Sequence, residues 1–98
     1  MKIHGLKTVQ PYFGQVKDGT KTAELRKNDR DFQVGDYLLL QEFEVTAHLT
    51  ATHLGGFERV GYCTGEFVLV EVTNVCHYPD ALKDGYVMLS FKKLEAQA

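Results

Sequence analysis

The stretch Glu66-Phe67-Val68-Leu69-Val70-Glu71-Val72-Thr73-Asn74-Val75 is rich in β-branched and aromatic side chains, which favour strands. Its apolar residues occur at both odd and even positions, so a strand here would have apolar side chains on both faces. This pattern is typical of a strand with two covered faces, as at the centre of a sheet. Residues 66–75 therefore predict a central strand around which the other elements are arranged.

Shorter segments with a strand-like pattern lie on both sides of this stretch. Residues 1–7 predict a first strand with Ile3 and Leu6 directed inward. Three more strands are predicted at residues 21–27, at residues 37–44 after a turn at 34–36, and at residues 86–93, whose Val87, Leu89 and Phe91 share one face.

A single helix is predicted between the first two strands. Thr8 suits its N-cap, Pro11 its first turn, and Gly19 the position just beyond its end. An apolar stripe at helical spacing is formed by Val9, Tyr12, Phe13 and Val16.

One helix with five or six strands predicts the α+β class, built as a small curled sheet or barrel. The 98 residues suit one domain, residues 1–98, with a variable hairpin or loop at 45–63 and a frayed tail at 95–98. We find neither a hydrophobic leader nor an apolar run of membrane-spanning length. The sequence therefore predicts a cytoplasmic protein with no membrane partner.

Charge is distributed unevenly along the chain. The formal net charge is −2, which argues against strong, sequence-independent binding to nucleic acid. Residues 1–34 carry seven Lys/Arg and four Asp/Glu, whereas residues 35–98 carry four and nine. The first third is thus +3 and the remainder −5, so positive potential is expected near the first third.

Residues 19–31 concentrate charges of both signs directly after the helix-ending glycine. Strand periodicity places Glu24 and Arg26 on one face and Lys21 on the other, unless the chain bends after Gly19. Arginine and lysine bind phosphate, and a glutamate accepts from an exocyclic amine or acts as a general base. We therefore predict a polar ligand site here; the alternative is a surface salt-bridge ladder of little energetic consequence.

Three neighbouring residues are added to the predicted ligand site. The turn-forming run 28–31 can bring Asn28 and Arg30 beside it, although a solvated loop is the alternative. His4 lies in the strand expected to adjoin this segment. It is a candidate base or stacking ring, with a hydrogen-bonded core histidine as the alternative.

Other residue types are interpreted as structural. The two cysteines, Cys63 and Cys76, lack metal or disulfide spacing and predict reduced thiols. There is no phosphate-binding glycine loop and no Ser-His-Asp pattern. No metal and no cofactor are expected from His48, His53 and His77, and core packing is expected for most of Tyr37, Phe43, Phe57 and Tyr62.

Residues 19–26 resemble the Gly-x-Lys-x-x-Glu-x-Arg signature of ASCH domains, which belong to the PUA-like superfamily. Further motifs resemble a short, uncharacterised DUF3850-like subgroup found in phages and in bacteria that carry prophages. These motifs lie at residues 4–7, 12–13, 26–32, 34–40 and 85–90. The resemblance covers about residues 1–44 and 64–94, and it implies a small PUA-like β-barrel of five to six strands with one or two helices.

The resemblance also implies a site. ASCH clefts are associated with RNA, so Lys21, Glu24 and Arg26 would line such a cleft and Gly19 would shape its rim. One branch of the superfamily hydrolyses N4-acetylcytidine with a lysine and a threonine three residues later. Glu24 stands at the threonine position here, so we do not expect that activity.

Three functions remain open at this point. The leading hypothesis is an RNA- or nucleotide-binding module. The alternative is a small hydrolase acting on RNA phosphodiesters or a modified nucleoside, with Lys21 and Glu24 as catalytic residues, because some ASCH proteins cleave RNA. The second alternative is a noncatalytic domain that binds a phage or host protein.

Overall fold

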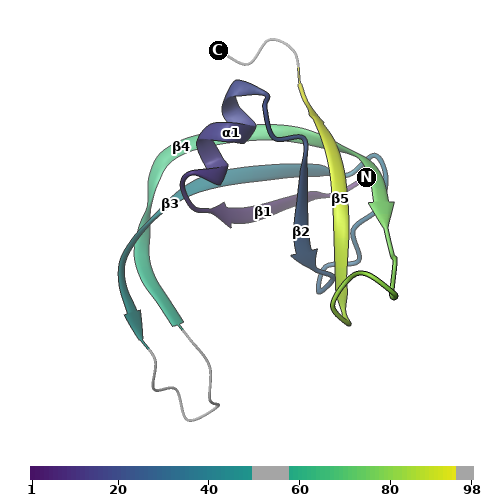
Figure 1. Ribbon diagram of the computed structural model, residues 1–98. Helices are drawn as coiled ribbons and strands as arrows, with labels where there is room; N and C mark the ends of the chain where they lie inside the picture. The colour runs from purple at the N-terminus through teal and green to yellow at the C-terminus, as the bar shows by residue number, and fades with distance from the viewer. Residues whose placement is uncertain (50–57, 95–98) are drawn as a thin grey trace.

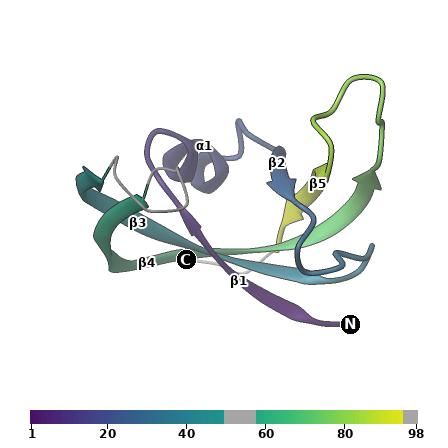
Figure 2. The same cartoon turned by 90° about the horizontal axis from the view of Figure 1, so that it is seen from below.

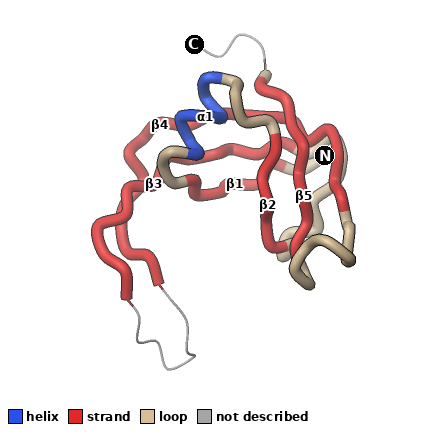
Figure 3. The backbone as a smooth tube through the Cα atoms, in the orientation of Figure 1, coloured by secondary structure: helices blue, strands red, loops and turns tan. Residues whose placement is uncertain are grey.

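Strands make up most of the chain in the computed structural model, which describes residues 1–49 and 58–94 (Figure 1). One helix lies between the first two strands, and the rest of the described chain is strand, turn or loop (Figure 3). In chain order the elements are β1 (Ile3–Thr8), α1 (Tyr12–Asp18), β2 (Ala23–Lys27), β3 (Tyr37–Leu49), β4 (Glu58–Cys76) and β5 (Tyr86–Lys93).

The five strands form one mixed sheet in the order β1-β3-β4-β5-β2. The strand β4 lies in the middle, as residues 66–75 predicted, and pairs antiparallel with both β3 and β5. The edge strands are β1, parallel to β3, and β2, antiparallel to β5. The sheet curls round α1 without β1 and β2 pairing, so it is open and the predicted closed barrel is not observed (Figure 2).

Side chains from two arginines lie where a closing strand would have to pair. The Arg26 Nη2 group donates to the Lys7 carbonyl at 3.1 Å, and Arg30 Nη1 donates to the Gly5 carbonyl at 2.8 Å. Because both carbonyls belong to β1, its outer edge is engaged by guanidinium groups from β2 and the following loop. Charged side chains at an edge strand are a common protection against unwanted pairing.

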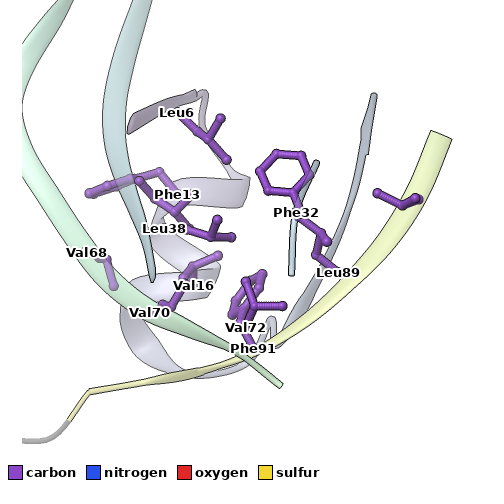
Figure 4. Close-up of a cluster of buried hydrophobic side chains, with 12 residues drawn as sticks. Leu6, Phe13, Val16, Phe32, Leu38, Val68, Val70, Val72, Leu89 and Phe91 are labelled. Carbon is purple, nitrogen blue, oxygen red and sulfur yellow. The ribbon is translucent and has the colours of Figure 1, made fainter. Parts of the chain in front are cut away.

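The hydrophobic core lies on the inner face of the curled sheet, under α1 (Figure 4). The predicted inward face of β5 is confirmed, because its Val87, Leu89 and Phe91 are all buried. On β4 only one face is covered, since Val70 is buried whereas Phe67 is 58% exposed. The other buried apolar residues are Leu6, Phe13, Val16, Phe32, Leu38, Leu40, Phe43, Val68 and Val72.

The beginning of the chain differs from its prediction in two ways. Ile3 points outward at 67% exposed, while His4, Leu6 and Thr8 point inward, so the predicted inward position of Ile3 is wrong. Thr8 ends β1 instead of capping α1, because its hydroxyl accepts a hydrogen bond from Arg26 Nη2 at 3.2 Å. In the first turn of α1, the Gly14 N–H donates instead to the side chain of Gln10, at 3.0 Å from its Oε1 atom.

Residues 45–49 and 58–63, where a hairpin or loop was predicted, are the paired arms of β3 and β4. The strand predicted at residues 37–44 therefore continues to Leu49. Two register shifts interrupt the pairing, between Gln41 and Phe43 and between Val45 and Ala47. Residues 50–57 and 95–98 lie outside the described part of the chain, so the tail prediction is not addressed.

No helix among the described residues is long and apolar enough to cross a membrane. The helix α1 has seven residues, whereas a spanning helix needs about 20.

Gly61 provides a test of the hairpin arms. A Cβ at this position would overlap the backbone carbonyl of Glu44. A Cβ at Gly5, in β1, would meet only the Gln41 side chain at 3.9 Å, an ordinary contact. We expect Gly61→Ala to lower the free energy of unfolding by about 1–3 kcal/mol, as overpacking does. Gly5→Ala, measured by the same urea titration, should change it little; equal effects would contradict this packing.

Candidate functional site

A cleft of about 720 Å³ runs along the free edge of β2. We call it the β2-edge cleft. It takes residues from the end of β1, the start of α1, the turn after α1, β2, β5 and one arm of the hairpin. Its lining residues are Lys7, Thr8, Val9, Tyr12, Lys21, Ala23, Glu24, Leu25, Arg26, Lys27, Arg59, Tyr86 and Met88.

The turn before β2 explains why Lys21 reaches the same cleft as Glu24 and Arg26. The sequence prediction put Glu24 and Arg26 on one face of a strand and Lys21 on the other, unless the chain bends after Gly19. The strand starts at Ala23, not at Lys21 as predicted, so Lys21 belongs to the turn before it. Residues from both faces of β2 line its unpaired edge. The structure therefore brings Lys21, Glu24 and Arg26 together in one cleft.

Glu24 and Arg26 form a partly buried ion pair. Arg26 Nε donates to Glu24 Oε2 at 3.0 Å, and Nη2 lies 3.0 Å from the same oxygen. The Arg26 Nη2 bonds to Lys7 and Thr8 complete its contacts. Neither the Nη1 group of Arg26 nor the Oε1 atom of Glu24 takes part in these bonds. The pair therefore fastens β2 to the end of β1 and keeps polar atoms for a ligand.

Lys21 is fixed by its own backbone and by an aromatic ring. Its Nζ donates to the Ala23 carbonyl at 2.7 Å and lies 5.6 Å from the centre of the Tyr12 ring. The ammonium group has three donors, so the single hydrogen bond leaves two for an anionic ligand. The position of Lys21 depends on Gly19, which ends α1 with φ 87° as predicted. Gly19 itself does not line the cleft.

His4 is placed in the core rather than in the cleft. Its ring is 7% exposed, packs edge-on against Phe32 with centroids 4.8 Å apart, and bonds through Nε2 to Asp36 Oδ2 at 2.8 Å. The Asp36 carboxylate also accepts from the backbone N–H groups of Lys2 and Gln33. This matches the alternative that the sequence left open, a hydrogen-bonded core histidine.

The remaining predicted ligand residues, Asn28 and Arg30, lie beside the cleft but do not line it. Arg30 donates to the Gly5 carbonyl and stays partly exposed. Asn28 lines a separate pocket of about 380 Å³ under the loop that joins β4 to β5. We call this the loop pocket, and its other lining residues are His77, Tyr78, Pro79, Leu82, Lys83, Asp84, Gly85, Tyr86 and Val87.

Sequence reasoning missed several residues of the cleft. Tyr12 was assigned to the apolar stripe of α1 but is 51% exposed. Lys27 follows the signature directly and was available to the same reasoning. No local pattern pointed to Arg59, because it reaches the cleft only through the pairing of β3 with β4, where it lies opposite His48.

Metal-binding chemistry receives no support from the part of the chain that the structure describes, where no three His, Cys, Asp or Glu residues cluster. His53 lies outside that part. Cys63 and Cys76 are both exposed and take part in no disulfide among the described residues.

Comparison with known proteins identifies relatives of this chain. A family model described as "Domain of unknown function (DUF3850)" matches residues 3–91. The chain is also 36% identical over 88 residues to the "Uncharacterized 12.9 kDa protein in GpA 3'region" of Escherichia phage P2. That alignment covers 90% of this chain and 66% of the phage protein, just under two thirds. The predicted resemblance to the DUF3850-like subgroup is confirmed, whereas the wider ASCH and PUA-like assignment stays a prediction.

Removal of one partner of the Glu24–Arg26 ion pair is expected to lower the free energy of unfolding. Arg26→Ala leaves the 6%-exposed Glu24 without its partner, and we expect a loss of about 2–4 kcal/mol in unfolding free energy. In a Glu24→Gln background the same change should cost less, because no buried charge is stranded. Urea titration of the single and double variants measures both costs. Equal costs in the two backgrounds would mean that the pair is energetically irrelevant.

The buried Asp36 predicts how stability responds to acid. Burial raises the pKa of Asp36, but hydrogen bonds from His4, Gln33 and Lys2 outweigh it and hold the pKa below its ordinary value of 3.8. A carboxyl whose pKa is lowered by folding stabilises the folded state above its unfolded pKa and loses this contribution as pH falls through the folded pKa. The unfolding free energies of the wild type and Asp36→Asn should therefore converge below pH 3.8. A constant difference from pH 7 to pH 2 would contradict this.

Proposed function

The chain belongs to the DUF3850 family, and on that premise we propose that it is a cytoplasmic RNA- or nucleotide-binding module whose ligand lies in the β2-edge cleft. The observation that carries the proposal is the charge of this cleft. Among the described residues its lining contains five cationic side chains, Lys7, Lys21, Arg26, Lys27 and Arg59, against the single carboxylate of Glu24.

Two of these cations are not used by the fold. No hydrogen bond or ion pair with another described residue engages the side chain of Lys27 or of Arg59. By contrast, Lys21 and Arg26 bond to neighbouring protein groups. Lys7 Nζ lies 4.8 Å from the centre of the Phe43 ring. The free pair comes from two different walls, β2 and the hairpin arm of β4. Two unpaired cations that line one cleft from different elements favour a ligand that carries negative charge, such as a phosphate group.

The uncharged part of the lining suits a planar base. Tyr12 is half exposed and Tyr86 and Met88 stand beside Leu25. Bases stack on aromatic rings regardless of their identity. The free Oε1 of Glu24 is an acceptor suited to an exocyclic amine. Phosphate, base and amine are thus each matched by a group in the cleft, and a nucleotide of adenine, guanine or cytosine contains all three.

The resemblance to ASCH domains supports the same proposal. In those domains the signature residues are associated with an RNA cleft, and here Lys21, Glu24 and Arg26 line one cleft together. We accordingly propose that the family is a PUA-like relative with an open sheet. The net charge of −2 favours a ligand held by a few contacts over tight binding to any polyanion.

Titration of labelled protein with the four ribonucleoside monophosphates and a mixed RNA tetranucleotide tests the proposal. We expect backbone amide shifts at residues 21–27 and 86–88. Lys27→Ala and Arg59→Ala should each weaken binding about fivefold, roughly 1 kcal/mol, without unfolding the protein. Lys92→Ala is the matched control, because Lys92 is an exposed lysine on β5 outside the cleft.

Two results would overturn the proposal. One is the absence of any shift at millimolar ligand, which would favour the protein-interaction alternative. The other is equal weakening by Lys92→Ala, which would show attraction to overall charge. Affinity should also fall with salt at a log–log slope of about −1.4, the value expected for the two contacts of Lys27 and Arg59 to single-stranded phosphates.

Hydrolysis is the second candidate function. It is favoured by one observation, that Lys21, Glu24 and Arg26 share a cleft in which a base and two cationic groups can meet a phosphodiester. The same titration reveals it as new product signals. Turnover that persists in both Lys21→Ala and Glu24→Gln would exclude these residues as catalytic.

A further inference from the structure

The loop pocket and the β2-edge cleft are neighbours that share one residue. Tyr86 lines both, from its position at the start of β5. Across the ladder it lies opposite Lys27, the last residue of β2 and one of the unpaired cations of the cleft. A ligand that extends past Lys27 and Tyr86 therefore passes directly from one hollow into the other.

Both hollows contain the same pairing of a tyrosine with a lysine. In the cleft, Lys21 Nζ lies 5.6 Å from the Tyr12 ring centre. At the shared border, Lys83 Nζ lies 5.5 Å from the Tyr86 ring centre. Lys21 is also held by the Ala23 carbonyl, but no hydrogen bond or ion pair with another described residue holds the Lys83 side chain. Lys83 can therefore move to a phosphate while a base takes its place on the Tyr86 ring.

The loop pocket has the composition of a base site rather than a phosphate site. Its charged residues are one cation, Lys83, and one carboxylate, Asp84, in contrast to the strongly positive cleft. Tyr78 contributes a ring that is 56% exposed. Its lining thus offers rings for stacking and mixed polar groups for a base edge.

Asn28 adds a buried side-chain oxygen that has no hydrogen-bond donor among the described residues. Its backbone N–H donates to the Gly85 carbonyl at 2.8 Å, which fixes the residue beside the loop. Its Oδ1 is the one buried side-chain polar atom, among those the structure describes, that no protein donor reaches. A buried acceptor without a donor costs about 1–3 kcal/mol, so such atoms are uncommon and call for a partner. An amino group of a base is a suitable donor.

We propose that the natural ligand is a single-stranded RNA segment of at least two nucleotides, bound across both hollows. Its phosphate lies against Lys27 and Arg59 in the β2-edge cleft, and the adjoining base enters the loop pocket to stack on Tyr78 or Tyr86 near Asn28. This inference rests on the proposed function and extends it from a nucleotide to a strand. It gives Asn28 a role as a base-contacting residue outside the signature cleft.

Length dependence tests the inference. We expect an RNA tetranucleotide to bind at least tenfold more tightly than the corresponding monophosphates. Tyr78→Ala should remove most of that gain, a loss of about five- to tenfold for the tetranucleotide, with little change for the monophosphates. Tyr62→Ala is the matched control, because Tyr62 is also 56% exposed but lines neither hollow.

The outcomes separate this inference from the proposed function. If monophosphates bind in the cleft but length adds nothing, or if Tyr78→Ala and Tyr62→Ala act alike on the tetranucleotide, the two-hollow ligand is wrong and the nucleotide proposal stands. If neither ligand binds, both are wrong. Amide shifts at residues 77–85 that appear only with the tetranucleotide would support the second hollow directly.

Discussion

The buried carboxylate of Asp36 is the constraint on which the rest of this fold depends. It accepts hydrogen bonds from His4 and from two backbone N–H groups, while its own backbone pairs with Val72 of the central strand. A buried carboxylate is stable only when such partners compensate its lost hydration. These bonds hold β1 parallel to β3, and the outer edge of β1 then supplies the carbonyls that Arg26 and Arg30 bind. The cleft thus depends on an acid group that lies outside it.

An open sheet makes the cleft possible and also limits its chemistry. In a closed barrel β2 would pair on both sides, and residues of only one parity would face any given surface. Here its free edge lets residues of both parities, such as Leu25 and Arg26, line one cleft, which Lys21 joins from the turn before the strand. The same opening requires other bonds across the gap, and Arg26 supplies two of them to β1. A guanidinium with these structural duties can offer a ligand only its remaining donors.

What the sequence predicted well depends on local pattern, and what it missed depends on distant partners. Alternation alone located the buried face of β5, and the apolar run at residues 66–75 located the central strand. Ile3 was predicted to point inward, but His4 takes an inward position, and its partner Asp36 lies 32 residues away in the sequence. Arg59 reaches the cleft through strand pairing that follows two register shifts, which no local pattern reveals. Barrel closure likewise depends on whether the first two strands meet, a non-local property.

The signature residues are therefore weaker indicators of function in this fold than their neighbours. Gly19 ends a helix, Lys21 bonds to the Ala23 carbonyl, and Glu24 with Arg26 joins two strands, so folding alone accounts for each of them. No hydrogen bond or ion pair to another described residue gives the side chain of Lys27 or Arg59 such an explanation, although both line the same cleft. Surface cations without partners are common singly, but two that face one cleft from different elements concentrate positive potential there, which folding does not require. The case for an anionic ligand consequently rests on the two residues outside the motif, and they are the positions where substitution separates binding from stability.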